Sequence, residues 1–195
     1  FFLFISLGYV PFTLLSGLVS SRIGHRGTIL LSLLASGAAL IAVSRAPSLG
    51  LIQAGLVLLG ATSGLYLPSA IPALAELAAG GGEGRALAVH ELAPNLGYIL
   101  LPLSAAALLP RLPWRSFLVG LGLACLAAAA AYLALGRGGR SRGQPPSLAN
   151  LRRVLTLPSY WFFTALFTLG VSAGIGVFSI LPTYLVAGRG FAPAA

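Results

Sequence analysis

Six long apolar stretches, separated by short segments that hold nearly all of the arginines, dominate this sequence and limit what it can fold into. Each stretch is about long enough to cross a bilayer, since a spanning helix needs roughly 20 apolar residues. The chain is 57% hydrophobic and only 8% charged. A soluble domain could not cover so much apolar surface with polar groups. We therefore predict a polytopic membrane protein with spans at residues 1–20, 27–43, 49–75, 86–109, 114–135 and 159–187.

The apolar runs are continuous, which decides the type of secondary structure that crosses the membrane. Inside lipid every backbone amide and carbonyl needs a partner, so only helices and closed barrels can span. Barrel strands alternate polar and apolar residues over short runs. The sequence thus predicts an all-α bundle of six transmembrane helices. It contains no methionine and starts without a polar segment, so we expect a fragment of a longer protein.

The arginines predict the orientation of the spans. All twelve basic residues are arginine, and the formal net charge is +9. Cytoplasmic loops carry the excess of positive charge. The side holding most arginines is therefore expected to face the cytoplasm, and no basic stripe remains for nucleic acid. The abundance of Ala, Gly and Arg suggests a bacterial protein of the inner (cytoplasmic) membrane. The cytoplasmic arginines follow the first, third and fifth spans: Arg22, Arg26, Arg85, Arg137, Arg140, Arg142, Arg152 and Arg153.

Few residues of this chain could support enzymatic chemistry. Cys125 is the only cysteine, aspartate is absent, and the two histidines are far apart in sequence. No disulfide within the chain, thiolate metal site or zinc-protease motif can be built from this set. No nucleophile lies beside a base in the sequence. We expect neither an enzyme nor a bound cofactor or metal.

Polar side chains inside the spans are the candidates for function, because they are costly in hydrocarbon unless they face a cavity or a partner. Glu91 lies within the fourth span, where low polarity would favour its neutral form and allow it to carry a proton. His90 beside it titrates in the same range. We name both as proton-coupling candidates. The alternative is that both lie in water near the inner interface, only a few residues beyond Arg85.

A second group of polar residues predicts the lining of a central cavity. Glu91, Asn95 and Tyr98 are spaced to share one face of a helix. The hydroxyl groups cluster in the third and sixth spans. Such groups also bond to their own helix or to a neighbouring one, so a structural role is the alternative for each. The candidates for the substrate cavity are Thr62, Ser63, Tyr66, Asn95, Tyr98, Ser172 and Ser179.

Glycine pairs four residues apart predict where helices pack closely. They occur at Gly60 and Gly64 and again at Gly170 and Gly174. Small residues at this spacing let helix backbones approach each other in lipid.

Residues 137–158 have the composition of a cytoplasmic linker between two bundles. The segment G-R-G-G-R-S-R-G-Q-P-P begins at Gly136 and combines glycine, proline and arginine. Ser147 can then cap a short helix whose leucines and valine share one face. Arg152 and Arg153 lie on the other face, as in a helix on an anionic membrane surface. A solvated loop is the alternative.

The loop G-L-V-S-S-R-I-G-H-R-G, residues 17–27, resembles the motif between helices two and three of the major facilitator superfamily, of the form G-x-x-x-D-R-x-G-R-R. Gly17, Arg22, Gly24 and Arg26 match it. Ser21 replaces the usual aspartate and His25 a usual arginine. In the family, the aspartate and the basic residues form a cytoplasmic latch that favours one state of the transport cycle.

Further segments resemble the same family in the same order. Residues 65–74 and 84–97 are similar to its helices four and five, and Trp114 and Arg115 to the pair that opens helix six. The segment L-P-T-Y-L at 181–185 resembles the outer end of helix seven. The resemblance covers the whole chain as helices two to seven of twelve. The family's antiporter motif is incomplete here, because Leu101 replaces its second glycine, so the resemblance gives no support for antiport.

The function that these observations predict is secondary active transport of a small solute by alternating access, with protons as the coupling ion. We expect an N-terminal bundle at 1–136 that lacks its first helix, the linker at 137–158, and the first helix of a second bundle at 159–195. The alternative is a non-transporting relative with an assembly or sensory role, or an inactive truncated gene product.

Overall fold

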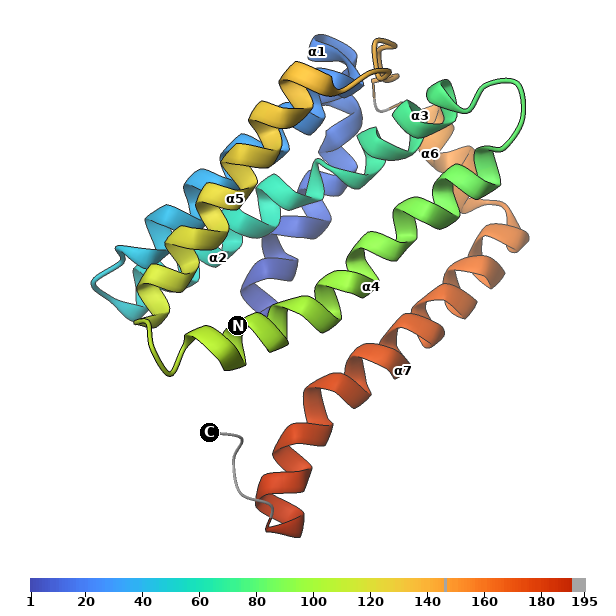
Figure 1. Cartoon of the computed structure of the whole chain (residues 1–195). Coiled ribbons are helices and arrows are strands. Elements are labelled where there is room, and N and C mark those ends of the chain that lie inside the picture. Colours follow the sequence, from blue (N-terminus) through green and yellow to red (C-terminus); the bar gives the residue numbers. More distant parts are fainter. Residues whose placement is uncertain (146, 191–195) are drawn as a thin grey trace. The chain divides into compact units, whose positions relative to one another are not determined.

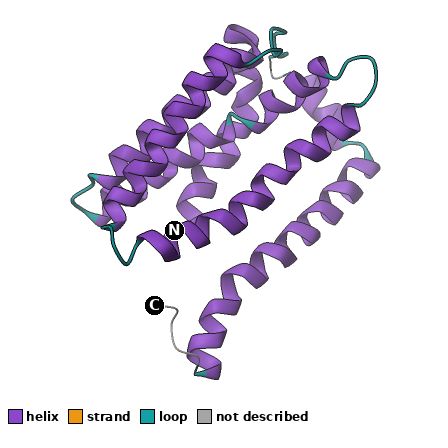
Figure 2. Ribbon diagram, viewed as in Figure 1, coloured by secondary structure: helices purple, strands orange, loops and turns teal. Residues whose placement is uncertain are grey.

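A computed structural model describes residues 1–145 and 147–190, apart from the side chains of residues 178, 179 and 182. The chain divides into two compact units, Phe1–Pro146 and Ser147–Ala195, which are described separately. All regular structure in the described residues is helical (Figure 2). The elements are α1 (Phe2–Ser44), α2 (Leu49–Gly64), α3 (Leu67–Leu77), α4 (Glu83–Leu108), α5 (Trp114–Leu135), α6 (Leu148–Leu155) and α7 (Pro158–Arg189).

Helix α1 is a hairpin of two helical halves that reverse direction at Gly24. This glycine has φ 75° and ψ 165°, a conformation outside the helical region that a residue with a side chain rarely adopts. The first half runs parallel to α2, since the backbone at Ile5 lies against Gly60 and Ser16 bonds to Leu65. The second half runs antiparallel to α2 (Figure 1), since it places Val43 against Gly55 and Ser36 against Thr62.

This hairpin accounts for the number of spans. Five helices are long and apolar enough to cross a membrane in the described residues, with α2 and α3 taken together. The first of them, Phe2–Ser44, has 43 residues, which at 1.5 Å per residue is about twice a bilayer core. The predicted runs at 1–20 and 27–43 are therefore its two halves, so the expected count of six is approximate and depends on how α1 is divided.

Glycine allows close packing between α1 and α2, as the sequence predicted for Gly60 and Gly64. A methyl group on Gly60 would overlap the carbonyl oxygen of Ile5, and one on Gly64 would lie 2.6 Å from that of Tyr9. Gly8 makes the reciprocal approach to Val57. By contrast, nothing lies within 4 Å of the corresponding positions on Gly170 and Gly174 in the described structure.

The third predicted span is interrupted where α2 ends and α3 begins, a break drawn as a short loop in Figure 2. Pro68 has no amide hydrogen to continue the helix, so the backbone turns at Leu65 and Tyr66. The carbonyl oxygen of Leu65 accepts a hydrogen bond of 3.1 Å from the buried hydroxyl of Ser16. In lipid a freed carbonyl needs such a partner.

Arg115 joins α5 to the end of α1. Its guanidinium donates to the carbonyl oxygens of Ser44 and Ala46 at 3.0 and 3.1 Å and lies 5.0 Å from the ring centre of Trp114. Carbonyls at a helix C-terminus lack helical partners and favour a cation. Gly37 and Gly122 bring α1 and α5 close together further along.

The second unit contains α6 and α7. Ser147 accepts a hydrogen bond from the amide of Asn150 at 3.5 Å and caps α6, as predicted. The indole of Trp161 donates to the carbonyl oxygen of Leu155 at 2.8 Å and so joins the two helices. All residues of α6 are exposed.

Candidate functional site

A cavity of ≈ 580 Å³ lies within the first unit, among α1, α2, the turn before α3, α4 and α5. Its walls combine apolar side chains with hydroxyl groups, two aromatic rings, one imidazole and one carboxylate. This composition is typical of a ligand site, where a few polar groups converge in an apolar pocket. The lining residues are Tyr9, Ser32, Leu33, Ser36, Ser63, Tyr66, Leu67, His90, Glu91, Ala93, Pro94 and Cys125.

A polar contact joins the turn before α3 to α4, and it is made by Tyr66 and His90. Their rings are stacked with centres 5.9 Å apart, and the Tyr66 hydroxyl lies 3.2 Å from His90 Nε2. On the other side of the imidazole, Nδ1 lies 3.7 Å from Glu91 Oε1, too far for a hydrogen bond. That nitrogen is buried and has no hydrogen-bond partner, whereas the Glu91 side chain is 59% exposed and lines the cavity.

The stacked pair also lines a second cavity of ≈ 310 Å³. This cavity is bounded mainly by apolar residues of α1, α3 and α5, together with Tyr132 and Arg137. Tyr66 and His90 therefore line both cavities. The smaller cavity is mainly apolar and has Arg137 in its lining, and the larger one has Glu91 in its lining.

The hydroxyl groups near the α2 break bond mainly to one another. Ser36 lies 2.9 Å from the Thr62 hydroxyl and 3.5 Å from that of Ser63. Thr62 also donates to the carbonyl oxygen of Leu59 at 3.0 Å. Of the two predicted residues here, Ser63 lines the cavity and Thr62 is buried behind it.

Of the three residues predicted to share a face of α4, one lines this cavity. Glu91 lines the large cavity, while Asn95 and Tyr98 are not part of its lining. The Asn95 amide donates to the carbonyl oxygen of Glu91 at 2.6 Å, so it bonds within its own helix. Tyr98 is 56% exposed.

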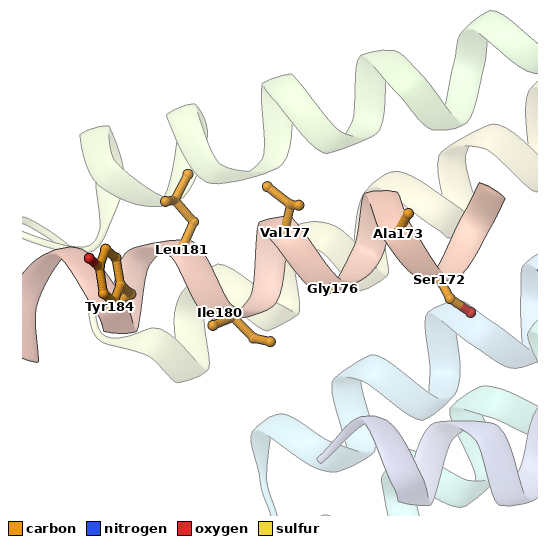
Figure 3. Close-up of a pocket in the computed structure, with 7 residues that line it drawn as sticks. All are labelled: Ser172, Ala173, Gly176, Val177, Ile180, Leu181 and Tyr184. Carbon is orange, nitrogen blue, oxygen red and sulfur yellow. The ribbon is translucent and has the colours of Figure 1, made fainter. Parts of the chain in front are cut away.

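Ser172 lies in α7, in the second unit. It lines a hollow of ≈ 420 Å³ whose other lining residues extend along α7 as far as Tyr184. In Figure 3 Ser172 and Tyr184 lie toward the two ends of the hollow, with apolar side chains between them. The side chain of Ser179, also predicted to face a cavity, lies outside those described.

Among the lining residues with a hydroxyl or thiol group, sequence reasoning missed four: Tyr9, Ser32, Ser36 and Cys125. Ser32 and Ser36 are four residues apart in an apolar span, a spacing that places both on one helix face and could have indicated them. Tyr9 could not be distinguished from an interfacial aromatic residue. Cys125 places a small thiol at the wall of the cavity, and such a side chain packs like a small apolar group.

The loop motif at 17–27 forms the reversal of α1 and holds the start of the linker. The amides of His25 and Arg26 donate to the carbonyl oxygens of Ser141 and Gly139 at 3.2 and 2.8 Å. The amide of Gly143 donates to the carbonyl oxygen of Ser20 at 3.2 Å. The glycine-rich start of the predicted linker is thus bound against the motif, because its amides and carbonyls are the partners of the turn.

The end of α3 strengthens this contact. The Ser141 hydroxyl donates to Glu76 Oε2 at 3.0 Å, and the Arg26 guanidinium donates to the carbonyl oxygen of Leu133 at 2.9 Å. Arg22 is exposed, and Gly17 accepts a hydrogen bond from Ser20. Ser21, which stands at the aspartate position of the motif, bonds to Leu18 in its own helix turn.

Comparisons with known proteins agree with this architecture. The arrangement is similar to crystal structures of a mutant of the peptide transporter POT, one of them in complex with sulfate. The TM-score is 0.51 in both cases, at 18% and 17% sequence identity. The matches cover 97% of this chain and 39% of the other, so the chain spans less than half of the transporter's length. No curated protein matches the sequence.

At that level of identity the structural likeness shows the fold, and the family assignment comes from the sequence. Residues 1–195 match the family profile described as Major Facilitator Superfamily. The chain is a member of the major facilitator superfamily.

Proposed function

We propose that this chain forms part of a secondary active transporter that moves a small solute by alternating access. The observation that carries this proposal is the cavity of ≈ 580 Å³ among the helices, in which hydroxyl groups, His90 and Glu91 face a largely apolar space. Polar groups in a membrane bundle are costly unless they serve a ligand or an ion pathway. Membership of the family supports the same function.

Protons are the proposed coupling ion, and His90 and Glu91 are the groups that take them up. Nδ1 of His90 and Oε1 of Glu91 lie 3.7 Å apart at the wall of the cavity. Tyr66 holds the imidazole from the other side at 3.2 Å. The pair would load a proton when the cavity opens to one side and release it when the cavity opens to the other.

The proposed setting is the inner (cytoplasmic) membrane of a bacterium, with the arginine-rich segment in the cytoplasm. Most arginines flank the same ends of the spans, in agreement with the positive-inside rule. Helix α6 would lie on the inner leaflet, with its apolar face in lipid and Arg152 and Arg153 at the headgroups.

Substitution of Glu91 tests the coupling. In the full-length protein reconstituted in liposomes, Glu91→Gln should abolish solute accumulation driven by a pH gradient. Solute exchange at equal pH should persist, because the amide keeps the shape of the side chain but cannot titrate. Glu83→Gln is the matched control, since this carboxylate is exposed at the start of α4, away from the cavity.

Two results would argue against the proposal. Accumulation by Glu91→Gln at the wild-type rate would remove Glu91 from the coupling mechanism. Failure of the full-length protein to move any solute from a broad panel, when it is correctly folded and inserted, would favour a non-transporting member of the family.

A further inference from the structure

The charges facing the large cavity limit the kind of molecule that can bind there. Glu91 is the only carboxylate in the lining, and none of the described lining residues is an arginine. The chain has no lysine. Arg137 lines the smaller cavity, on the other side of the Tyr66 and His90 pair. An anionic ligand would therefore meet a carboxylate with no fixed positive charge to offset the repulsion.

The hydrogen-bonding groups of the lining argue against a sugar or another polyol. Such a ligand needs many free donors and acceptors, because each buried hydroxyl left without a partner is costly. Here Ser36 and Ser63 lie within 3.5 Å of each other, and Ser36 also contacts Thr62 at 2.9 Å. Much of the hydroxyl capacity of the cavity is thus used within the protein.

The remaining surface is apolar and aromatic. Leu33, Leu67 and Pro94 offer hydrocarbon contact, and the rings of Tyr9 and Tyr66 line the same space. Aromatic faces attract cations, most strongly where water is excluded. The carboxylate of Glu91 has one basic neighbour among the described lining residues, the imidazole of His90, whose Nδ1 lies 3.7 Å away and carries charge only when protonated.

We propose that the cavity binds a monovalent organic cation with an apolar body, held by Glu91 and the tyrosine rings. The substrate class rests on the proposed transport function, because the same cavity serves both. When the carboxyl group of Glu91 is protonated, binding of the cation expels that proton to water and leaves the cation beside the carboxylate. Proton and cation therefore compete for one site, an exchange that the incomplete antiporter motif did not indicate.

Equilibrium binding of tetraphenylphosphonium tests this substrate class. Its matched control is tetraphenylborate, which has nearly the same size and shape but a negative charge. With the full-length protein in lipid nanodiscs, we expect the phosphonium to bind saturably and the borate not to bind. The titratable groups lining the cavity are Tyr9, Tyr66, His90, Glu91 and Cys125.

The pH dependence has a definite sign. Lowering the pH until the carboxyl group in the cavity is protonated should weaken phosphonium binding, because the neutral acid has no negative charge with which to hold the cation. In weakly buffered solution at low pH, binding should release protons. Phosphonium binding that is unchanged or tighter in acid would overturn the proposal, and this measurement needs no variant.

Substitution assigns the effect to one residue. Glu91→Gln should weaken phosphonium binding up to about fivefold, the effect of losing a charge pair with a carboxylate that is 59% exposed. Glu83→Gln should leave it unchanged. Wild-type affinity in a folded Glu91→Gln protein, or tighter binding of the borate, would refute the cation site.

Binding is measured without flux, so a protein that binds the phosphonium but moves no solute would contradict only the transport function. One that moves another solute but does not bind the phosphonium would contradict only the substrate class.

Discussion

Replacement of Gly60 by alanine tests the close packing of α1 on α2. A Cβ atom at this position would overlap the backbone carbonyl of Ile5 and also lie 3.0 Å from the amide nitrogen of Tyr9. Neither neighbour is the end of a flexible side chain. The two helices must therefore separate by on the order of 1 Å, and a gap of that size forfeits roughly a quarter to a half of the dispersion energy of each contact it opens.

The expected cost follows from the extent of that interface. Overpacking of a well-packed site typically costs about 1–3 kcal/mol, and a rigid backbone neighbour places Gly60→Ala toward the upper end. Alanine is a better helix former than glycine by about 1 kcal/mol, which offsets part of the loss. We expect a net destabilisation of roughly 1–2 kcal/mol. Stability can be measured by titrating the protein from mild detergent into dodecyl sulfate and following helicity by circular dichroism.

Gly120→Ala is the matched control, because this glycine lies inside α5 with nothing within 4 Å of a Cβ atom. It gains the same helix propensity without a clash, so it should be neutral or slightly stabilising. If Gly60→Ala is as stable as Gly120→Ala, the close approach of α1 and α2 does not hold in the folded protein.

Two further predictions concern the linker and the orientation. Gly143→Val would place a side chain against the buried hydroxyl of Ser20 and should release the linker from the reversal of α1. The rate of trypsin cleavage at the linker arginines should rise about tenfold, which corresponds to a loss of about 1.4 kcal/mol of hydrogen bonding. Gln144→Val, a substitution at an exposed position, should leave the cleavage rate unchanged. The orientation can be tested with single-cysteine variants in a Cys125→Ala background and a membrane-impermeant thiol reagent. Pro47→Cys should be labelled in intact cells, whereas Arg22→Cys should be labelled only after lysis. The opposite pattern would show that the predicted topology is inverted.

Much of the fold follows from the sequence because the solvent of this chain is lipid. Each apolar run must satisfy its own backbone, so the positions of helices can be predicted from hydropathy alone. The span predicted at 114–135 coincides with α5, and Ser147 caps α6 as expected. Gly60 and Gly64 could also be identified in advance, since small residues mark close helix contacts in membranes.

The site depends on which helix faces meet, and hydropathy carries no information about that. Glu91, Asn95 and Tyr98 have the spacing of one face, yet only Glu91 lines the cavity and Asn95 bonds to its own helix. The stacking of Tyr66 on His90 joins residues from two helices, and the turn that presents Tyr66 arises from Pro68.

The sequence by itself therefore determined the class of the protein, the number and order of its apolar runs and the family to which it belongs. These properties follow from local composition and from the need to pair every backbone group in lipid. The tertiary structure decided that α1 folds back at Gly24, that the linker segment at 139–143 binds this reversal, and that Tyr66, His90 and Glu91 gather at one cavity. Each of these depends on contacts between residues distant in sequence, and their geometry exists only when the helices are packed.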